Sequence, residues 1–358
     1  MWDERASRLR REITQLAAAG LSVSELHTAA IELVGRTVGS ELTCWASIDP
    51  ETQVISTMVS GPARVPADYE PRLAEAEYSA DEPHTFAALA REGTTVARLS
   101  DLPAADLRRS ARLHRVWRPL GMAEELRVMF RVDGVCWGGA GMIRSRLDFT
   151  PREAEFLTAV APAIGAATRL AVRSDVHGGG AGGRPALVII GAGGALLAVT
   201  PDARQWRERL DAIAPGRFQV MMQVMASGSR SAASGYFTAR LRDADGQWSV
   251  LRASTLLGGE EDQVAVIVEP ATGVHLLGLL LMAYHLSVRE REVCREVMGG
   301  FSTSEIAEHL FISVHTVQDH LKSVFVKVGV RSRGELVARL RPDHPDGYTT
   351  TDRQLAQL

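Results

Sequence analysis

The sequence predicts a multidomain protein in which two α+β domains precede an all-α domain of four short helices. A chain of 358 residues is too long for one ordinary domain. The glycine-rich stretch "HGGGAGGRP", residues 177–185, cannot pack a core and is typical of a flexible linker. Strand and helix patterns occur on both sides of this linker, whereas helix-start signals dominate after residue 285.

Composition and charge exclude several classes of protein. Apolar residues make up 46% of the chain and charged residues 23%, which is ordinary for a soluble globular protein. The net charge of −3 means that any nucleic-acid surface must be local. Cys44, Cys136 and Cys294 lie far apart, which argues against a disulfide framework or a zinc site. A charged N-terminus and apolar runs shorter than the ~20 residues of a membrane span predict a cytoplasmic protein with no membrane segment.

The first domain, residues 1–176, combines strands with helices. An amphipathic helix over 4–19 precedes a second helix opened by a Ser22/Glu25 capping box. Two hairpins follow, one around residue 50 and one with Asp133-Gly134 at its turn, and Thr150 caps a closing helix. This order predicts an antiparallel sheet with helices packed on it. The basic run 107–121 is interpreted as a solvated helical face rather than a nucleic-acid patch.

The second domain, residues 186–271, has the same mixture. Two strands joined by a glycine-rich turn precede a helix over 202–213, a hairpin with Asp245-Gly246 at its turn, and a buried strand. "GAGGAL" is similar to a dinucleotide fingerprint, but Leu196 stands where the third glycine belongs and a strand follows. A second α+β sheet domain without a nucleotide site is therefore expected.

A connector helix over 272–285 leads into the C-terminal domain, residues 286–341, and the remaining 342–358 are expected to form a flexible tail. Helices this short are marginal alone, so caps set where each begins and packing stabilises them. Two of them joined by a tight turn, followed by two more, predict a helix-turn-helix bundle. The start signals are Ser287/Glu290, Ser302/Glu305, Ser313 and Ser332/Glu335.

The helix that follows Ser313 has two distinct faces. Val314, Val317, Leu321, Val324 and Val328 recur every three or four residues and should face inward. His315, Gln318, Asp319 and Lys322 share the opposite face. In helix-turn-helix proteins the second helix lies in the major groove, where Gln can pair with adenine and Lys with guanine or phosphate. Residues 313–341 hold six Lys/Arg against two acidic residues, a local charge of +4 that favours double-stranded DNA as partner.

The C-terminal domain resembles the LuxR/FixJ-type DNA-binding domain of bacterial regulators over about fifty residues. The matching segments include Arg289-Glu290, "GFSTSEIA" and "ISVHTV". The resemblance implies base contacts at Gln318, Asp319 and Lys322. Many members have lysine in place of Gln318, so the DNA sequence that those members recognise cannot be assigned to this protein. The first domain resembles a GAF domain and the second a PAS-type sensor. The expected DNA-binding residues are Ser302, Thr303, Ser313, His315, Thr316, Gln318, Asp319, His320, Lys322, Lys327, Arg331 and Arg333.

These features predict a bacterial, sequence-specific transcription regulator whose sensory domains control the DNA-binding domain. A small-molecule or protein signal and RNA polymerase are the expected partners. One recognition helix makes few base contacts, so we expect a homodimer on DNA, joined through Leu336, Val337 and Leu340. No catalytic residue, metal site or cofactor is expected, and ligand-binding residues are not assigned. The alternatives are a protein-interaction module that has lost DNA binding, favoured by the acidic Asp319, and an enzyme.

Overall fold

The computed structural model describes residues 2–177, 183–243, 245–258 and 263–341. The chain divides into two compact units, one made of residues 1–175 and 181–271 and the other of residues 176–180 and 272–358. Residues 178–182 of the predicted linker and the predicted tail, 342–358, lie outside the described residues.

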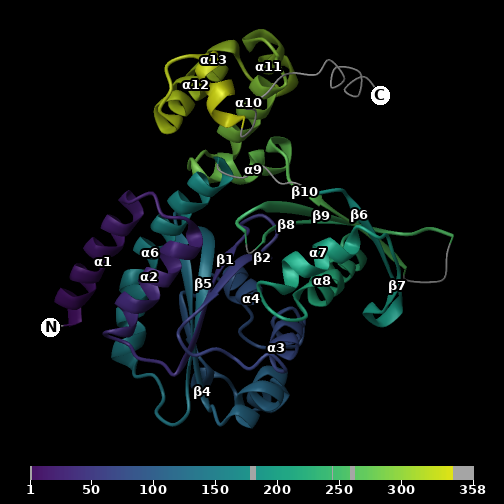
Figure 1. The fold of residues 1–358 in the computed structure, drawn as a ribbon. Helices are drawn as coiled ribbons and strands as arrows, with labels where there is room; N and C mark the ends of the chain where they lie inside the picture. The colour runs from purple at the N-terminus through teal and green to yellow at the C-terminus, as the bar shows by residue number, and fades with distance from the viewer. Residues whose placement is uncertain (1, 178–182, 244, 259–262, 342–358) are drawn as a thin grey trace. The chain divides into compact units, whose positions relative to one another are not determined.

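The first unit begins with an antiparallel sheet in the order β2-β1-β5-β4-β3. Helices α2 and α6 cover one of its faces, while α3 and α4 lie on the other (Figure 1). Both predicted hairpins are confirmed, with Asp133 and Gly134 in the left-handed region at the second turn. The elements are α1 (Trp2–Ala18), α2 (Val23–Gly35), β1 (Leu42–Ile48), β2 (Ile55–Ser60), α3 (Glu70–Glu77), α4 (Phe86–Glu92), β3 (Val96–Arg98), α5 (Ala104–Arg109), β4 (Glu124–Val132), β5 (Val135–Arg144) and α6 (Pro151–His177).

A second antiparallel sheet follows, in the order β7-β6-β10-β9-β8. When the strands of each sheet are numbered from its own first strand, the two orders are identical, although the sequence contains no evident repeat. Helices α7 and α8 pack on this sheet. The elements are β6 (Ala186–Ile190), β7 (Leu196–Val199), α7 (Ala203–Asp211), α8 (Arg217–Ser231), β8 (Tyr236–Arg242), β9 (Trp248–Thr255) and β10 (Val264–Pro270).

The two sheets belong to one compact unit. Arg240 of β8 donates to both carboxylate oxygens of Asp49, at 2.6 and 2.9 Å, and Arg242 forms an ion pair with Asp175 at the end of α6. Val54, next to β2, belongs to the hydrophobic cluster beneath the second sheet. Buried polar and apolar contacts therefore both join the sheets.

The basic run 107–121 is largely a solvated face, as predicted: Arg108, Arg109, Arg115 and Arg118 are exposed, and Arg112 is the exception. Arg112 is fully buried and forms ion pairs with Glu82 at 3.4 Å and Glu125 at 2.9 Å. Glu125 also accepts from Arg127 at 3.1 Å. Trp117 in the same run is buried as well. Arg112 leaves the solvated face for an internal ion-pair network because its carboxylate partners come from segments distant in the sequence.

One described helix, Pro151–Val176, is long and apolar enough to cross a membrane by length and composition alone. More than half of its most apolar window, 56%, is buried within the protein. Val160 and Ile164 of this helix are among the buried core residues, which explains its apolar composition.

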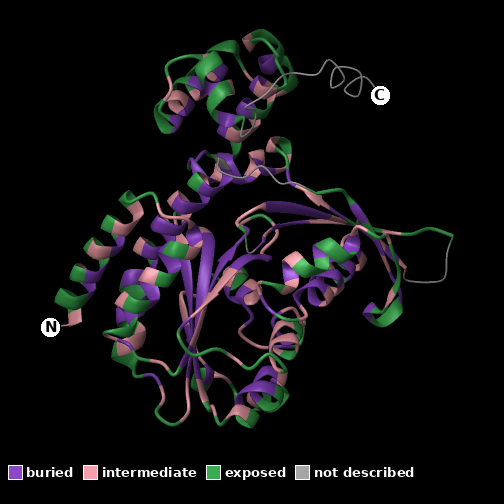
Figure 2. Cartoon of the chain, in the orientation of Figure 1, coloured by how far each residue is buried: buried purple, intermediate pink, exposed green. Residues whose placement is uncertain are grey.

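The second unit is a bundle of short helices: α9 (Gly273–Ala283), α10 (Val288–Met298), α11 (Thr303–His309), α12 (Val314–Val328) and α13 (Arg333–Leu340). Buried residues line the inner sides of these helices (Figure 2). Helix α10 packs on α12 and α13, and α11 packs on α12. Helix α9, the predicted connector, also packs on α10 and α13, so it is part of this bundle.

Candidate nucleic-acid interface

Side-chain caps begin each helix of the predicted domain where the sequence indicates. Complete capping boxes join Ser287 with Glu290 and Ser302 with Glu305. Ser332 accepts from the Glu335 N–H. Ser313 accepts from the Thr316 N–H at 3.0 Å, and the two hydroxyls lie 2.8 Å apart. The start of α12 is thus held in one register by the side chains of its own first turn.

Helix α12 presents the expected polar face to solvent. Val317, Leu321, Val324 and Val328 are buried, whereas Val314 is 42% exposed and was wrongly assigned to the inner face. The exposed side brings together His315, Gln318, Asp319 and Lys322. His315, Gln318 and Asp319 lie in the N-terminal half of the helix, where base edges are met in helix-turn-helix proteins, and Lys322 lies just past its middle.

Asp319 is the electrostatic centre of this exposed face. Its carboxylate oxygens lie 3.2 Å from the Lys322 ammonium and 3.5 Å from His315 Nε2. All three side chains are largely exposed, so these contacts are screened by water and worth less than about 1 kcal/mol each. A phosphate or a base edge could displace either contact at small energetic cost.

Lys327 has a structural role that the sequence analysis did not foresee. Its ammonium donates to both carboxylate oxygens of Glu290, at 2.7 and 2.9 Å. Glu290 is 5% exposed and also accepts from the Ser323 hydroxyl at 2.6 Å and the Ser287 N–H at 2.7 Å. This contact fastens α12 to the start of α10. The spacing of Ser323 and Lys327 places both side chains on one face of α12, and this spacing is the sequence feature that could have indicated a shared partner.

The remaining predicted residues lie around this helix. Arg333 donates to the Phe301 carbonyl, and the Arg331 N–H donates to Glu335. His320 is half-buried on α12. Ser302 and Thr303 begin α11. Phe311, which the sequence analysis missed, is 94% exposed in the turn before α12 and has a left-handed φ of 55°.

Comparison with known proteins identifies this segment. Residues 284–340 match the family model described as bacterial regulatory proteins, luxR family. The C-terminal segment belongs to the luxR family. An HTH-type transcriptional regulator of Mycobacterium bovis is 48% identical over 52 residues, which are 14% of this chain and 6% of that protein. GfsR of Streptomyces halstedii, named as an HTH-type transcriptional regulator, is 32% identical over 101 residues, 27% of this chain and 41% of that protein.

The likeness to these relatives is confined to part of each protein, since this chain spans less than half of their length. Among solved structures, the phycoerythrobilin-bound GAF domain of a cyanobacterial phytochrome matches 46% of this chain and 95% of its own. The sequence identity is 12% and the TM-score 0.34. The luxR-family assignment therefore rests on the C-terminal segment alone.

The luxR-family bundle corrects the expectation for α13. Leu336 and Leu340 are 0% exposed, so they belong to the core of their own unit and do not form an exposed apolar edge. Val337, between them, is half-buried. The reason is that α9 packs against α13 and covers part of the surface that the sequence analysis left open.

Replacing Ser313 by alanine is expected to lower the free energy of unfolding of the luxR-family unit by about 1 kcal/mol, because the Thr316 N–H loses its acceptor. Urea denaturation of a fragment comprising residues 272–341 measures this. The control is Gln318→Ala, which changes an exposed side chain on the same helix and should leave stability within about 0.5 kcal/mol of the original. Equal losses in both variants would contradict the assigned cap.

Proposed function

We propose that this protein is a bacterial, sequence-specific DNA-binding transcription regulator and not an enzyme. The observation that carries the proposal is the exposed face of α12, where Gln318 and Lys322 project from a capped helix held in a luxR-family bundle. Gln318 offers a donor and an acceptor to adenine, and Lys322 offers a cation to guanine or phosphate. A helix fixed at its first turn by Ser313 and near its end by Lys327 can present both groups in a constant register.

The N-terminal unit supplies the sensory part of the proposal. Its two sheets, GAF-like and PAS-like in the sequence analysis, would respond to a small molecule or a protein and change the activity of the DNA-binding unit in the cytoplasm. Specific affinity from one short helix is limited, so two chains on adjacent half-sites about one helical turn apart are part of the proposal. RNA polymerase is the proposed partner at the promoter.

Selection of bound sequences from random double-stranded DNA, with the full chain as bait, tests the proposal directly. A regulator should enrich a motif with two related half-sites. Enrichment of a single half-site would contradict the proposed dimer. Recovery of DNA without sequence preference would contradict the proposal of sequence-specific binding.

Replacing Lys322 by alanine is expected to weaken DNA binding in one of two ways. If the ammonium contacts phosphate, affinity falls for every sequence and the slope of log K against log salt decreases by about 1. If it reads guanine, discrimination at one position falls by about 1–3 kcal/mol. Fluorescence anisotropy at several salt concentrations separates these results. Arg295→Ala, which removes an exposed cation from α10, is the control and should leave specificity unchanged.

Asp319→Asn should have the opposite effect on affinity. The substitution removes a negative charge from the proposed interface and frees Lys322 from its ion pair at 3.2 Å. Tighter binding to all DNA is the expected result. Weaker binding confined to a single base position would instead identify Asp319 as an acceptor for cytosine N4.

The same ion pair supports a second candidate function. Asp319 partly neutralises the cations beside it, and an acidic group at the centre of this face repels phosphate. A protein-interaction module with degenerate DNA binding would have this character. The random-DNA selection distinguishes the two, because such a module yields no motif.

A further inference from the structure

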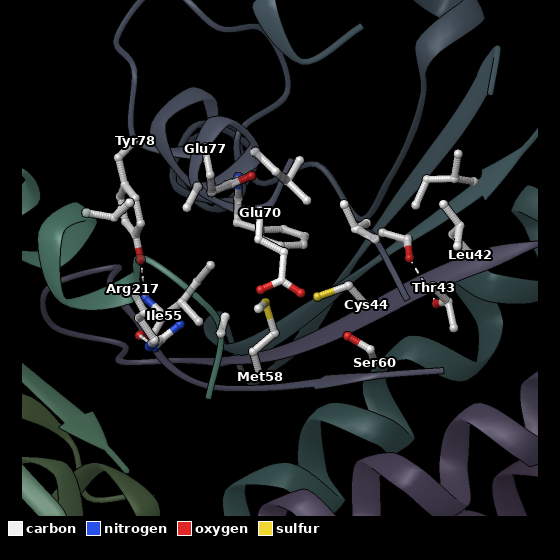
Figure 3. A pocket seen from close by; sticks show the side chains of 18 of the residues that line it. Leu42, Thr43, Cys44, Ile55, Met58, Ser60, Glu70, Glu77, Tyr78 and Arg217 are labelled. Atoms are coloured by element: carbon white, nitrogen blue, oxygen red, sulfur yellow. Dashed lines mark hydrogen bonds between the residues drawn. The ribbon is translucent and has the colours of Figure 1, made fainter. Parts of the chain in front are cut away.

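A cavity of about 100 Å³ lies within the N-terminal unit, between the first sheet and helices α3 and α8 (Figure 3). Most of its wall is apolar. The first sheet contributes Leu42, Ile55, Met58 and Ile143, and α8 of the second sheet domain contributes Val220 and Met221. It is smaller than the cavity of about 150 Å³ that holds benzene in an engineered protein, so a ligand with one substituted ring requires the cavity to widen on binding.

Three charged residues of the cavity wall already have partners. Arg127 forms ion pairs with Glu77 at 2.7 Å and with Glu125 at 3.1 Å, and all three side chains are almost fully buried. Glu77 also accepts from the Phe86 N–H at 2.6 Å. These residues form a closed network that leaves no charge for a ligand. Burial raises the pKa of Cys44, also in the wall, to about 12, so its thiol is protonated and unreactive at neutral pH.

Arg217 differs from these residues. Its side chain is 7% exposed, and its contact is a hydrogen bond from Nη2 to the Ile55 carbonyl at 3.1 Å. Its Nε has no acceptor, and no carboxylate among the described residues lies within ion-pair distance. Burial lowers the pKa of this guanidinium, and the neighbouring Tyr78 and Cys44 offset that effect only in part. A buried cation without an ionic partner costs free energy of folding, and a bound anion would relieve that cost.

Two further polar groups point to the same ligand. The Tyr78 hydroxyl accepts from the Ile55 N–H at 3.1 Å, which leaves its own proton available, and Tyr78 lies at the same end of the cavity as Arg217 (Figure 3). Glu70 lies farther along, and its buried Oε2 has no hydrogen-bond partner. The cavity thus has two donors at one end, an apolar middle and a carboxyl group beyond.

We infer that this cavity binds a small, one-ring carboxylic acid whose carboxylate accepts from Arg217 and Tyr78, and whose hydroxyl or amino group donates to Glu70. This inference deepens the sensory part of the proposed function by naming a ligand class. Because α8 belongs to the second sheet domain, the ligand contacts both sheet domains at once, and its binding stabilises their association.

Calorimetric titration of the full chain with 4-hydroxybenzoate tests the inference. The matched probes are phenol, which lacks the carboxylate, and benzoate, which lacks the donor. The original protein should bind 4-hydroxybenzoate about tenfold or more tightly than phenol, since a hydrogen bond to a charged group is worth that much. Arg217→Gln should remove this advantage, and Glu70→Ala should make 4-hydroxybenzoate no better than benzoate. Arg204→Gln, an exposed arginine of α7, should change neither.

A thermal melt of the ligand-free variants separates a binding role from a structural one. Arg217→Gln should melt at the same or a higher temperature, because it removes a buried charge without an acidic partner. Arg217→Met serves as a second variant. A lower melting temperature in both, or equal binding of 4-hydroxybenzoate and phenol by the original protein, overturns the inference. Neither experiment contains DNA, so failure here leaves the proposed DNA binding untouched, and failure of the DNA selection leaves this site untouched.

Discussion

Replacing Glu290 by glutamine is expected to lower the free energy of unfolding of the C-terminal unit by about 3 kcal/mol. The substitution removes the charge that pairs with Lys327 and leaves that ammonium without its partner. It also weakens the hydrogen bonds from Ser323 and from the Ser287 N–H. Urea denaturation of the fragment 272–341 measures the loss. Since α12 is fastened to α10 through this carboxylate, DNA affinity should fall together with stability.

The same variant should change how stability depends on pH. Burial alone would raise the pKa of Glu290, but hydrogen bonds from Lys327, Ser323 and Ser287 and the charge of Lys327 outweigh it and lower the pKa to about 2. The stabilisation is therefore fully present above the ordinary pKa of 4.5 and is lost as the pH falls towards 2. Glu290→Gln should flatten this acid limb of the stability curve.

Glu292→Gln is the matched control, because it makes the same change on the same helix. Glu292 pairs with Arg289 at the surface, and such pairs contribute less than about 1 kcal/mol. If the two variants lose equal stability, or if the acid limb of the Glu290 variant is unchanged, the buried carboxylate does not hold α12 in place.

Replacing Leu340 by aspartate is expected to unfold the C-terminal unit at neutral pH. The side chain is 0% exposed, so the change removes a buried leucine and places a charge without a partner in the core. Together these effects should cost at least about 4 kcal/mol. Far-ultraviolet circular dichroism of the fragment 272–341 reports the loss of helix. A folded variant would mean that α13 does not pack as the structure has it.

Val337→Asp separates bundle packing from association of two chains. Val337 is half-buried, so this variant should remain folded. If α13 joins two proteins on DNA, the variant should lose tight binding to a probe with two half-sites while keeping weak binding to one half-site. Equal binding by the variant and the original protein would show that α13 does not form the proposed dimer contact.

The parts that could be predicted from the sequence are those encoded over a few residues. Ser302 with Glu305, Ser313 with Thr316, and Asp133 with Gly134 set helix starts and a hairpin turn through neighbours within four positions. The exposed face of α12 follows from periodicity alone. The same local signals explain why the candidate interface could be located before the fold was known.

The parts that could not be predicted depend on distant partners or lack a periodic pattern. Arg112 is buried because Glu82 and Glu125 approach it from other segments. Helix α8 was not predicted from the sequence, because its N-cap residue, Gly216, has no side chain to cap it and the helix buries residues on most of its circumference. Helix α3 likewise lacks a side-chain cap, and both helices line the cavity. The cavity could therefore not be predicted from the sequence.

The buried ion pair between Asp49 and Arg240 has a consequence for how this architecture can be inherited. A second sheet transplanted without the first would expose Arg240 without its carboxylate and uncover the apolar cluster that contains Val54. Recombination within the glycine-rich segment would therefore separate groups that compensate each other. The two sheets share one topology, yet they are expected to evolve as a single exchangeable piece, with substitutions at position 49 tolerated only alongside substitutions at position 240.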